Sequence, residues 1–198
     1  MKKLLYLLGG NTLSSFAIAC VLNSGLGAFS CTAGNSGIAS FMGISLGLAS
    51  FITETLMLLY ATCRNEGVGW TAIINTTYGS LMIDVFHKLL PVSPWLALGG
   101  FLLPIAWSYM GRAGWGDTGT NLAMVALMKQ TGKSLRFCRC CIDITFLIFA
   151  LLWASHTVSL FTLFLTFATG PIVQFVYGKI HYNPELIKHH FILAKRCS

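Results

Sequence analysis

The sequence predicts an all-α protein, a polytopic bundle of transmembrane helices made of two tandem repeats. Hydrophobic residues fill 55% of the 198 positions and charged residues only 10%, whereas about a quarter of the residues in a soluble domain are charged. The mean hydropathy is +0.72. The same order of glycines, apolar segments and an intramembrane acid also returns 89 positions later. Together these observations indicate a chain built twice within a membrane.

The apolar segments define the helices of each repeat. They cover roughly residues 4–22, 30–42, 46–62 and 70–86 in the first half, and 94–110, 119–130, 137–154 and 158–178 in the second. A helix needs about 20 residues to cross the hydrocarbon core, and the second segment of each half is clearly shorter. We therefore expect three long helices and one short one per repeat. The first repeat covers 1–90 and the second 91–180, followed by a cytoplasmic tail over 181–198.

The register between the repeats rests on five identities and one exchange of acid for acid. The matching pairs are Gly25 with Gly114, Gly27 with Gly116, Gly43 with Gly132, Ser45 with Ser134, Leu46 with Leu135, and Glu54 with Asp143. Since five identities carry little weight alone, the shared order of the apolar segments is the stronger argument for a repeat.

The short segments leave two topologies open. If all eight segments cross with the N-terminus in the cytoplasm, eleven Lys and Arg residues lie inside and two outside. If the short segments only re-enter, six helices cross and the distribution becomes twelve to one. Both satisfy the positive-inside rule. Three crossings per half would make the repeats inverted, and four would make them parallel.

Charge and cysteine patterns argue against several other classes of protein. The net charge is +7, but Lys and Arg sit at the ends of apolar segments, which indicates topology signals and no nucleic-acid surface. The seven cysteines show no disulfide spacing. Cys138, Cys140 and Cys141 have no His nearby, which argues against a metal site. The sequence contains no recognisable set of a nucleophile and a base, so we do not expect an enzyme, and we expect no cofactor.

Glu54 is the first candidate for a functional group, because an ionised side chain within a membrane segment is costly. On one continuous helix, Gly43, Gly47, Ser50 and Glu54 would form a stripe of small residues ending in an acid. Two interpretations stay open, which are helix packing across the bundle and binding of a solute or coupling ion. With no basic residue on its own face, Glu54 must find a partner on another helix, stay protonated or face water.

The equivalent face of the second copy holds Gly132, Arg136, Arg139 and Asp143. Arg139 and Asp143 are spaced i, i+4 and are predicted to form an ion pair within one helix. For Asp143 the structural interpretation is this satisfied pair, and the functional one is binding of a substrate or coupling ion.

Asp84 lies near His87 and Lys88 at the end of an apolar segment. Its simplest interpretation is an ion pair at the membrane interface.

Two glycine-rich junctions, 25–37 and 111–119, collect polar residues beside the short segments. These polar residues are Asn23, Thr32, Asn35, Asp117, Thr118, Thr120 and Asn121. Irregular backbone at membrane depth must line a cavity, and broken helices there present N-termini to anions or carbonyls to cations. The alternative is an ordinary surface loop, which the short apolar segment beside each junction makes the weaker interpretation. We therefore count Thr32, Asp117 and Asn121, with the turn glycines Gly27 and Gly116, among the candidate binding residues.

These motifs resemble those of the YczE/YyaS/YitT family of small bacterial integral membrane proteins, over nearly all of the chain up to about Lys179. The best matches are Ser24–Gly27, Gly43–Gly47, Gly79–Phe86, Thr131–Ser134 and Gly170–Gln174. Members of that family carry Pro and then Asp shortly after the Leu-Gly turn, where this sequence has Thr32 and Asn121 and no Pro. The resemblance implies the bacterial cell membrane and a poorly defined activity, often guessed to be transport.

We expect a multi-pass protein of the inner membrane, with both termini cytoplasmic, that acts as a secondary transporter or exporter of a small solute. The alternative is a non-transporting membrane scaffold or sensor that acts through helix–helix contacts. The expected partners are the lipid bilayer and a small molecule or ion, with no nucleic acid. The size of the chain is compatible with a homodimer, for which the sequence holds no specific signal.

Overall fold

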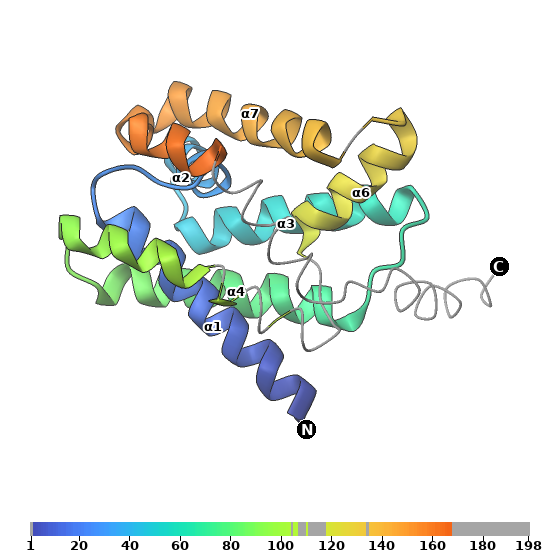
Figure 1. Cartoon of the computed structure of the whole chain (residues 1–198), viewed down its shortest axis with the longest axis horizontal. Helices are drawn as coiled ribbons and strands as arrows, with labels where there is room; N and C mark the ends of the chain where they lie inside the picture. The colour runs from blue at the N-terminus through green and yellow to red at the C-terminus, as the bar shows by residue number, and fades with distance from the viewer. Residues whose placement is uncertain (1, 104, 107–109, 111–117, 134, 168–198) are drawn as a thin grey trace.

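The computed structural model describes residues 2–103, 105, 106, 110, 118–133 and 135–167. These residues form helices and turns without a β-strand, which confirms the predicted all-α class for the described part (Figure 1). The elements are α1 (Lys2–Asn23), α2 (Ser30–Met42), α3 (Leu46–Cys63), α4 (Trp70–Leu89), η1 (Pro94–Phe101), α6 (Gly119–Thr131), α7 (Leu135–Trp153) and η2 (Ser155–Thr157). Residues 160–167 are helical as well.

Where both ends of a helix are described, its bounds agree closely with the predicted apolar segment, with one local difference. Parts of the segments predicted over 94–110 and 158–178, and the tail predicted over 181–198, lie outside the described residues. The segment predicted over 94–110 opens as a 3₁₀ helix, η1, and not as an α-helix. Pro94 in its first turn has no N–H to donate. Gly99 brings the segment so close to α1 that a Cβ there would lie 3.1 Å from the Sγ of Cys20. The 3₁₀ geometry thus occurs where η1 packs closely against α1.

The two short helices, α2 and α6, have the same length and begin 89 positions apart. Each has 13 residues and ends at a glycine with φ of 65°, Gly43 after α2 and Gly132 after α6. Glycine adopts this left-handed conformation without strain, so both glycines stop their helices. The prediction that Gly43 and Gly132 share helical faces with Glu54 and Asp143 is therefore wrong, because both lie before α3 and α7 begin.

Asp84, near the end of α4, caps the start of α3. Its carboxylate accepts hydrogen bonds from the Ser45 hydroxyl and from the Gly47 N–H, the latter at 2.6 Å. A carboxylate is stabilised at a helix N-terminus, where backbone N–H groups have no intrahelical partner. Within the described residues, this cap replaces the ion pair predicted for Asp84 with His87 and Lys88, and it fixes α3 against α4.

Helices α1 and α4 lie side by side and run in the same direction. The Asn11 amide donates to the Asn75 carbonyl, and the Ser15 hydroxyl donates to the Gly79 carbonyl, both across 64 positions. Because Asp84 joins the end of α4 to the start of α3, α3 runs in the opposite direction to both.

Helix α2 packs along α7 in the same direction. Its contacts advance from Ser30 against Asp143 to Phe41 against Trp153, whose ring centroids are 4.9 Å apart. Since α2 ends at the turn before α3, the end of α7 lies at the end of the bundle where α3 begins. Helices α3 and α7 are therefore antiparallel, and in Figure 1 the colours run left to right along α3 and right to left along α7.

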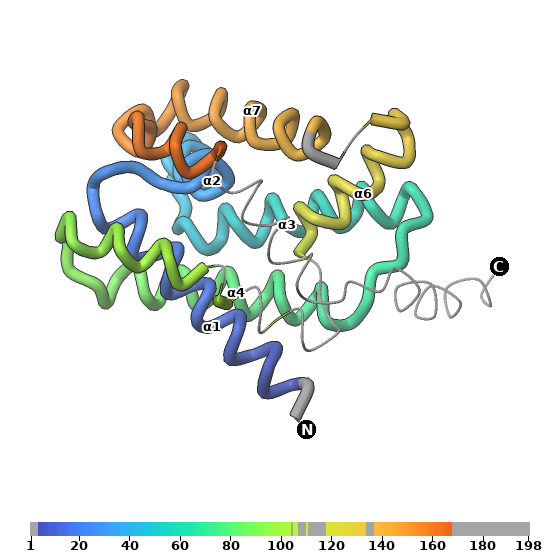
Figure 2. The backbone as a smooth tube through the Cα atoms, viewed as in Figure 1, coloured from blue at the N-terminus to red at the C-terminus, as the bar shows by residue number. Residues whose placement is uncertain are grey.

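Two glycines of α2 allow this close approach to α7 (Figure 2). A Cβ at Gly34 would lie 2.7 Å from the carbonyl oxygen of Phe146, and one at Gly37 would lie 2.9 Å from the carbonyl carbon of Phe149. Those contacts are with backbone atoms, which cannot move aside as a flexible side chain can. Small residues at helix interfaces are typical of packing between helices in membranes.

Apolar side chains cover much of the surface, while polar side chains fill the interior. Large exposed apolar residues occur on each long helix, for example Leu5, Leu59, Leu81 and Leu152. The buried polar side chains include Asn11, Ser15, Asn35, Ser50, Thr53, Asn75, Thr76, Thr120 and Asp143. Exposed apolar side chains on every long helix are expected where helices face lipid. Two described helices, over Leu4–Asn23 and Leu46–Cys63, are long and apolar enough to cross a bilayer.

We expect Gly37→Ala to lower the free energy of unfolding by about 1 to 3 kcal/mol, because the added methyl group must displace the α7 backbone. Gly9→Ala in α1 is the matched control, since nothing lies within 4 Å of a Cβ at that position. Because alanine has a higher helix propensity than glycine, Gly9→Ala should leave the free energy of unfolding unchanged or raise it by up to about 1 kcal/mol. Thermal unfolding of the purified variants in detergent measures both changes. Equal unfolding temperatures for the two variants would contradict the close packing of α2 on α7.

Candidate functional site

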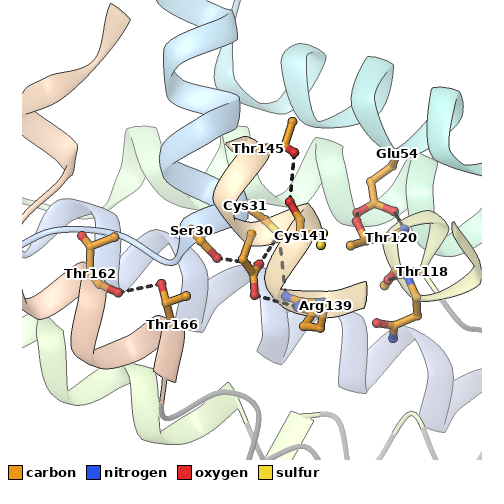
Figure 3. Close-up of polar contacts among 12 residues, drawn as sticks. Ser30, Cys31, Glu54, Thr118, Thr120, Arg139, Cys141, Thr145, Thr162 and Thr166 are labelled. Atoms are coloured by element: carbon orange, nitrogen blue, oxygen red, sulfur yellow. Dashed lines mark hydrogen bonds and ion pairs between the residues drawn. The ribbon is translucent and has the colours of Figure 1, made fainter. Parts of the chain in front are cut away.

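Glu54 lies in the middle of α3 and holds the start of α6. Its carboxylate accepts one hydrogen bond from the Thr120 hydroxyl at 2.6 Å and one from the Thr120 N–H at 3.0 Å (Figure 3). Thr120 is the second residue of α6, so the acid satisfies one of the N–H groups that a helix start leaves without an intrahelical partner. The positive end of the helix dipole also stabilises the negative charge.

The contact between Glu54 and α6 depends on a glycine. A Cβ at Gly119 would lie 2.8 Å from the Oε2 of Glu54, so a larger residue would push α6 away from α3. Thr118 caps α6 from the preceding position, because its hydroxyl accepts a hydrogen bond from the Asn121 N–H at 3.3 Å. With Thr118 as the cap and no side chain at Gly119, the Thr120 N–H can donate to the Glu54 carboxylate.

Asp143 occupies the equivalent place in α7 and holds the start of α2. Its Oδ1 accepts a hydrogen bond from the Ser30 hydroxyl at 2.7 Å and lies 3.5 Å from the Sγ of Cys31. Its Oδ2 accepts one from the Nε of Arg139 at 3.1 Å, so the predicted i, i+4 ion pair is confirmed. Asp143 is only 3% exposed. These contacts offset part of the cost of burying its charge.

The two acids make reciprocal contacts between the halves of the chain. Glu54 and Asp143 are 89 positions apart, and so are their partners Thr120 and Cys31. Each acid belongs to a long helix of one half and reaches the start of the short helix of the other half. Arg139 pairs with Asp143, and its Nη2 lies 3.7 Å from the Sγ of Cys31 at the start of α2. The short helices therefore begin inside the bundle, beside the middle of a long helix.

A cavity of about 120 Å³ lies beside Glu54, between α1, α2, α3 and α4. Most of its lining side chains carry hydroxyl or amide groups: Asn11, Ser14, Ser15, Thr32, Asn35, Ser50, Asn75, Thr76, Ser80 and Thr118. Among the described residues, Glu54 is the only acid in the lining, and no Lys, Arg or His lines it. The described chain also holds no cluster of three His, Cys, Asp or Glu side chains that would suit a metal ion.

Two buried polar groups in the cavity wall have no hydrogen-bond partner within the described chain. They are the side-chain nitrogen of Asn75 and the hydroxyl of Thr76, on residues that are 4% and 5% exposed. A buried polar group without a partner costs about 1 to 3 kcal/mol, and folded proteins contain few of them. Neighbouring groups of this kind in one cavity wall indicate a place where a polar molecule would be stabilised.

The structure brings four of the predicted residues to one region. Thr32 and Glu54 line the cavity. Arg139 and Asp143 lie next to it, because both contact Cys31, which is itself a lining residue.

Of the other predicted residues, Gly27 and Asn121 are described and do not line the cavity. Gly27, with φ of 134°, is in a turn where a Cβ would lie 3.3 Å from the backbone nitrogen of Thr162, away from the cavity. Asn121 lies in the first turn of α6. Asp117 and Gly116 lie outside the described residues.

The sequence analysis missed the contribution of α1 and α4 to this site. Asn11, Asn75 and Thr76 lie within long apolar segments, where an uncharged polar residue is a weaker signal than an acid. The available signal was the i, i+4 spacing of Asn11 with Ser15 and of Asn75 with Gly79. That spacing gains its meaning from the parallel packing of the two helices, which local patterns do not encode.

The sequence matches the profile of a family of unknown function (DUF6198) over residues 1–178. Because the match covers most of the chain, the chain belongs to this family. No curated protein and no solved structure is significantly similar to it. The function is therefore inferred from the site.

We expect Arg139→Ala to lower the free energy of unfolding by about 3 to 5 kcal/mol, because it leaves Asp143 buried without a compensating charge. The double variant Arg139→Met with Asp143→Asn should recover most of this loss. The amide that replaces the carboxylate keeps an oxygen that accepts from Ser30 and carries no charge. Thermal unfolding in detergent compares the two variants. If the double variant were no more stable than Arg139→Ala, the cost would not arise from an unpaired buried charge.

Proposed function

We propose that this member of the DUF6198 family is a multi-pass membrane protein that moves a small polar solute along a path between its two halves. The observation that carries the proposal is the reciprocal contact of Glu54 and Asp143 with the starts of α6 and α2, beside a polar cavity. Transporters with inverted repeats bind their solutes near the bilayer midplane, where broken helices begin. The resemblance of the sequence motifs to the YczE/YyaS/YitT family supports the same proposal.

The two halves are proposed to be inverted repeats. Support comes from the equal lengths and constant offset of α2 and α6 and from the antiparallel course of α3 and α7. Equivalent helices of parallel repeats would run in the same direction. Helices of 13 residues reach about 20 Å at about 1.5 Å per residue, short of the hydrocarbon core of about 30 Å. In this proposal six helices cross, while α2 and α6 enter only part of the way.

The basic residues support an orientation with the N-terminus in the cytoplasm. Arg64 follows the end of α3, and Lys129 and Lys133 lie at the end of α6, which meets α3 through a Tyr60–Gln130 hydrogen bond of 2.9 Å. Helix α1 begins at this same end, because it runs parallel to α4. Under the positive-inside rule this end faces the cytoplasm, and the proposed location is the bacterial inner membrane.

Movement of the halves against each other is the proposed mechanism. At the cytoplasmic end, Glu66 of the first half pairs with Lys129 of the second at 2.8 Å. In the middle of the bundle, Glu54 and Asp143 each hold a short helix of the other half. A relative movement of the halves would therefore change all three contacts together. Rocking of one repeat against the other around a central site is the basis of alternating access.

Single cysteines that replace Asn65 and Lys88 are expected to react with a membrane-impermeant maleimide from opposite sides. Both residues are exposed, one after α3 and the other near the end of α4. In a cysteine-depleted background, the probe at position 65 should label from the cytoplasm and the probe at position 88 from the periplasm. Labelling of intact cells and of inverted vesicles measures the difference. Because the start of α1 lies at the same end as residue 65, the reverse pattern would place the N-terminus in the periplasm and contradict the proposed orientation. Labelling of both positions from one side would contradict the proposed crossing of α4.

Proteoliposomes containing the protein are expected to take up at least one solute from a labelled panel of small amines, amino alcohols, carboxylates and amides. Glu54→Gln should slow this uptake at least about tenfold, or about 1.4 kcal/mol, because it removes the charge beside the cavity. Thr77→Val, at an exposed position of α4, is the control that should leave uptake unchanged. No uptake across the panel, with co-purification of a stoichiometric partner, would instead favour a scaffold.

A further inference from the structure

We infer that the cavity beside Glu54 binds small organic ammonium ions that also carry an oxygen atom, of which amino alcohols are the simplest. This inference deepens the proposed function and rests on it for the role of the cavity as the solute site. Three observations support it: the hydrogen-bonding capacity of Glu54, the balance of buried charge, and the two groups in α4 that have no partner.

Glu54 supplies the group that recognises a cation. An ionised carboxylate has about four lone-pair positions for hydrogen bonds. Thr120 occupies two of them, and the Gly119 N–H approaches the same carboxylate. Not all lone-pair positions of the carboxylate are therefore occupied, and Glu54 lines the cavity, where an ammonium group could donate to it.

The balance of buried charge also favours a cation. The region contains two acids, Glu54 and Asp143, and one base, Arg139, which is paired with Asp143. With both acids ionised, one negative charge is left over. An uncompensated charge within a membrane bundle is expensive, so a ligand with a single positive charge would be stabilised, and an anion would not.

The unpartnered groups of α4 favour a ligand that carries a hydrogen-bond acceptor, such as an oxygen atom. The side-chain nitrogen of Asn75 is a donor and needs an acceptor, while the Thr76 hydroxyl can donate or accept. A bare metal cation cannot accept a hydrogen bond from Asn75. A hydroxyl or carbonyl oxygen of an organic ligand can satisfy both groups.

The size of the cavity fits a ligand of this kind. Its volume of about 120 Å³ is roughly ten times the approximately 12 Å³ that one water molecule needs on a comparable measure. The cavity therefore has room for a solute of several heavy atoms, and Glu54 of α3 and Asn75 and Thr76 of α4 are all among its lining residues.

Equilibrium binding of three matched probes tests the inference. Ethanolamine, glycolate and glycolamide are similar in size and all carry a hydroxyl group, but they differ in charge. With the full-length protein in detergent, saturation-transfer NMR or calorimetry should show ethanolamine binding at least about tenfold more tightly than glycolate, with glycolamide between them. Glu54→Gln should weaken ethanolamine binding at least about tenfold and leave glycolamide binding nearly unchanged.

Substitutions of the neighbouring residues Thr76 and Thr77 test whether the Thr76 hydroxyl binds a ligand or stabilises the fold. Thr76→Val removes the unpartnered hydroxyl with little change of shape. It should weaken ethanolamine binding severalfold and raise the unfolding temperature by about 2 to 4 °C. Thr77→Val should change neither quantity, because Thr77 is exposed and its hydroxyl donates to the Ile73 carbonyl at 2.9 Å. A gain in stability together with a loss of binding is typical of a group kept for function.

Several outcomes would overturn the inference. The first is that the protein binds no ethanolamine, and the second is that it binds glycolate as tightly as ethanolamine. The third outcome is that Glu54→Gln leaves the ethanolamine affinity unchanged. Because binding is measured without a gradient, it is independent of flux. Ethanolamine binding without uptake of any solute would overturn the transport proposal alone, and uptake of other solutes without ethanolamine binding would overturn this inference alone.

Discussion

An ionised carboxylate inside a bundle of membrane helices must be held by hydrogen bonds and opposite charge, because lipid supplies neither. In the membrane protein proposed above that constraint would fall on Glu54 and Asp143, whose carboxylates accept hydrogen bonds from Thr120 at the start of α6 and from Ser30 at the start of α2. Free backbone N–H groups exist only where a helix begins. At the start of α6 the Thr120 N–H donates to Glu54, whereas at the start of α2 the side chains of Ser30 and Cys31 contact Asp143. Both short helices therefore begin beside an acid in the middle of a long helix.

These contacts also require backbones that approach closely. Gly119 brings α6 against Glu54, while Gly34 and Gly37 bring α2 against α7. Helices in a membrane gain little from hydrophobic burial, so tight packing at small residues and hydrogen bonds between helices hold them together. The same glycines that allow close packing therefore allow the acids to reach their partners in the other half of the chain.

The interior of the bundle is not optimised for stability alone. A fully satisfied core would give Asn75 and Thr76 partners or replace them with apolar residues, and here both are buried without a partner in the described chain, beside a cavity. Proteins often keep such unfavourable groups where a ligand binds, because the ligand completes the hydrogen bonds. The cavity and the acid pair meet at Glu54, so one side chain belongs both to the contact between the halves and to the cavity lining.

The bounds of most helices and the Arg139–Asp143 pair were determined by the sequence alone, because hydropathy and i, i+4 spacing are local properties. Gly43 and Gly132 were assigned to the wrong place for the same reason, since residue spacing does not distinguish a glycine within a helix from one that ends it. Only the tertiary structure decided the partner of Glu54, the antiparallel course of α3 and α7, and the cavity. Each of these joins residues between 18 and 113 positions apart, and such contacts depend on how helices pack in three dimensions.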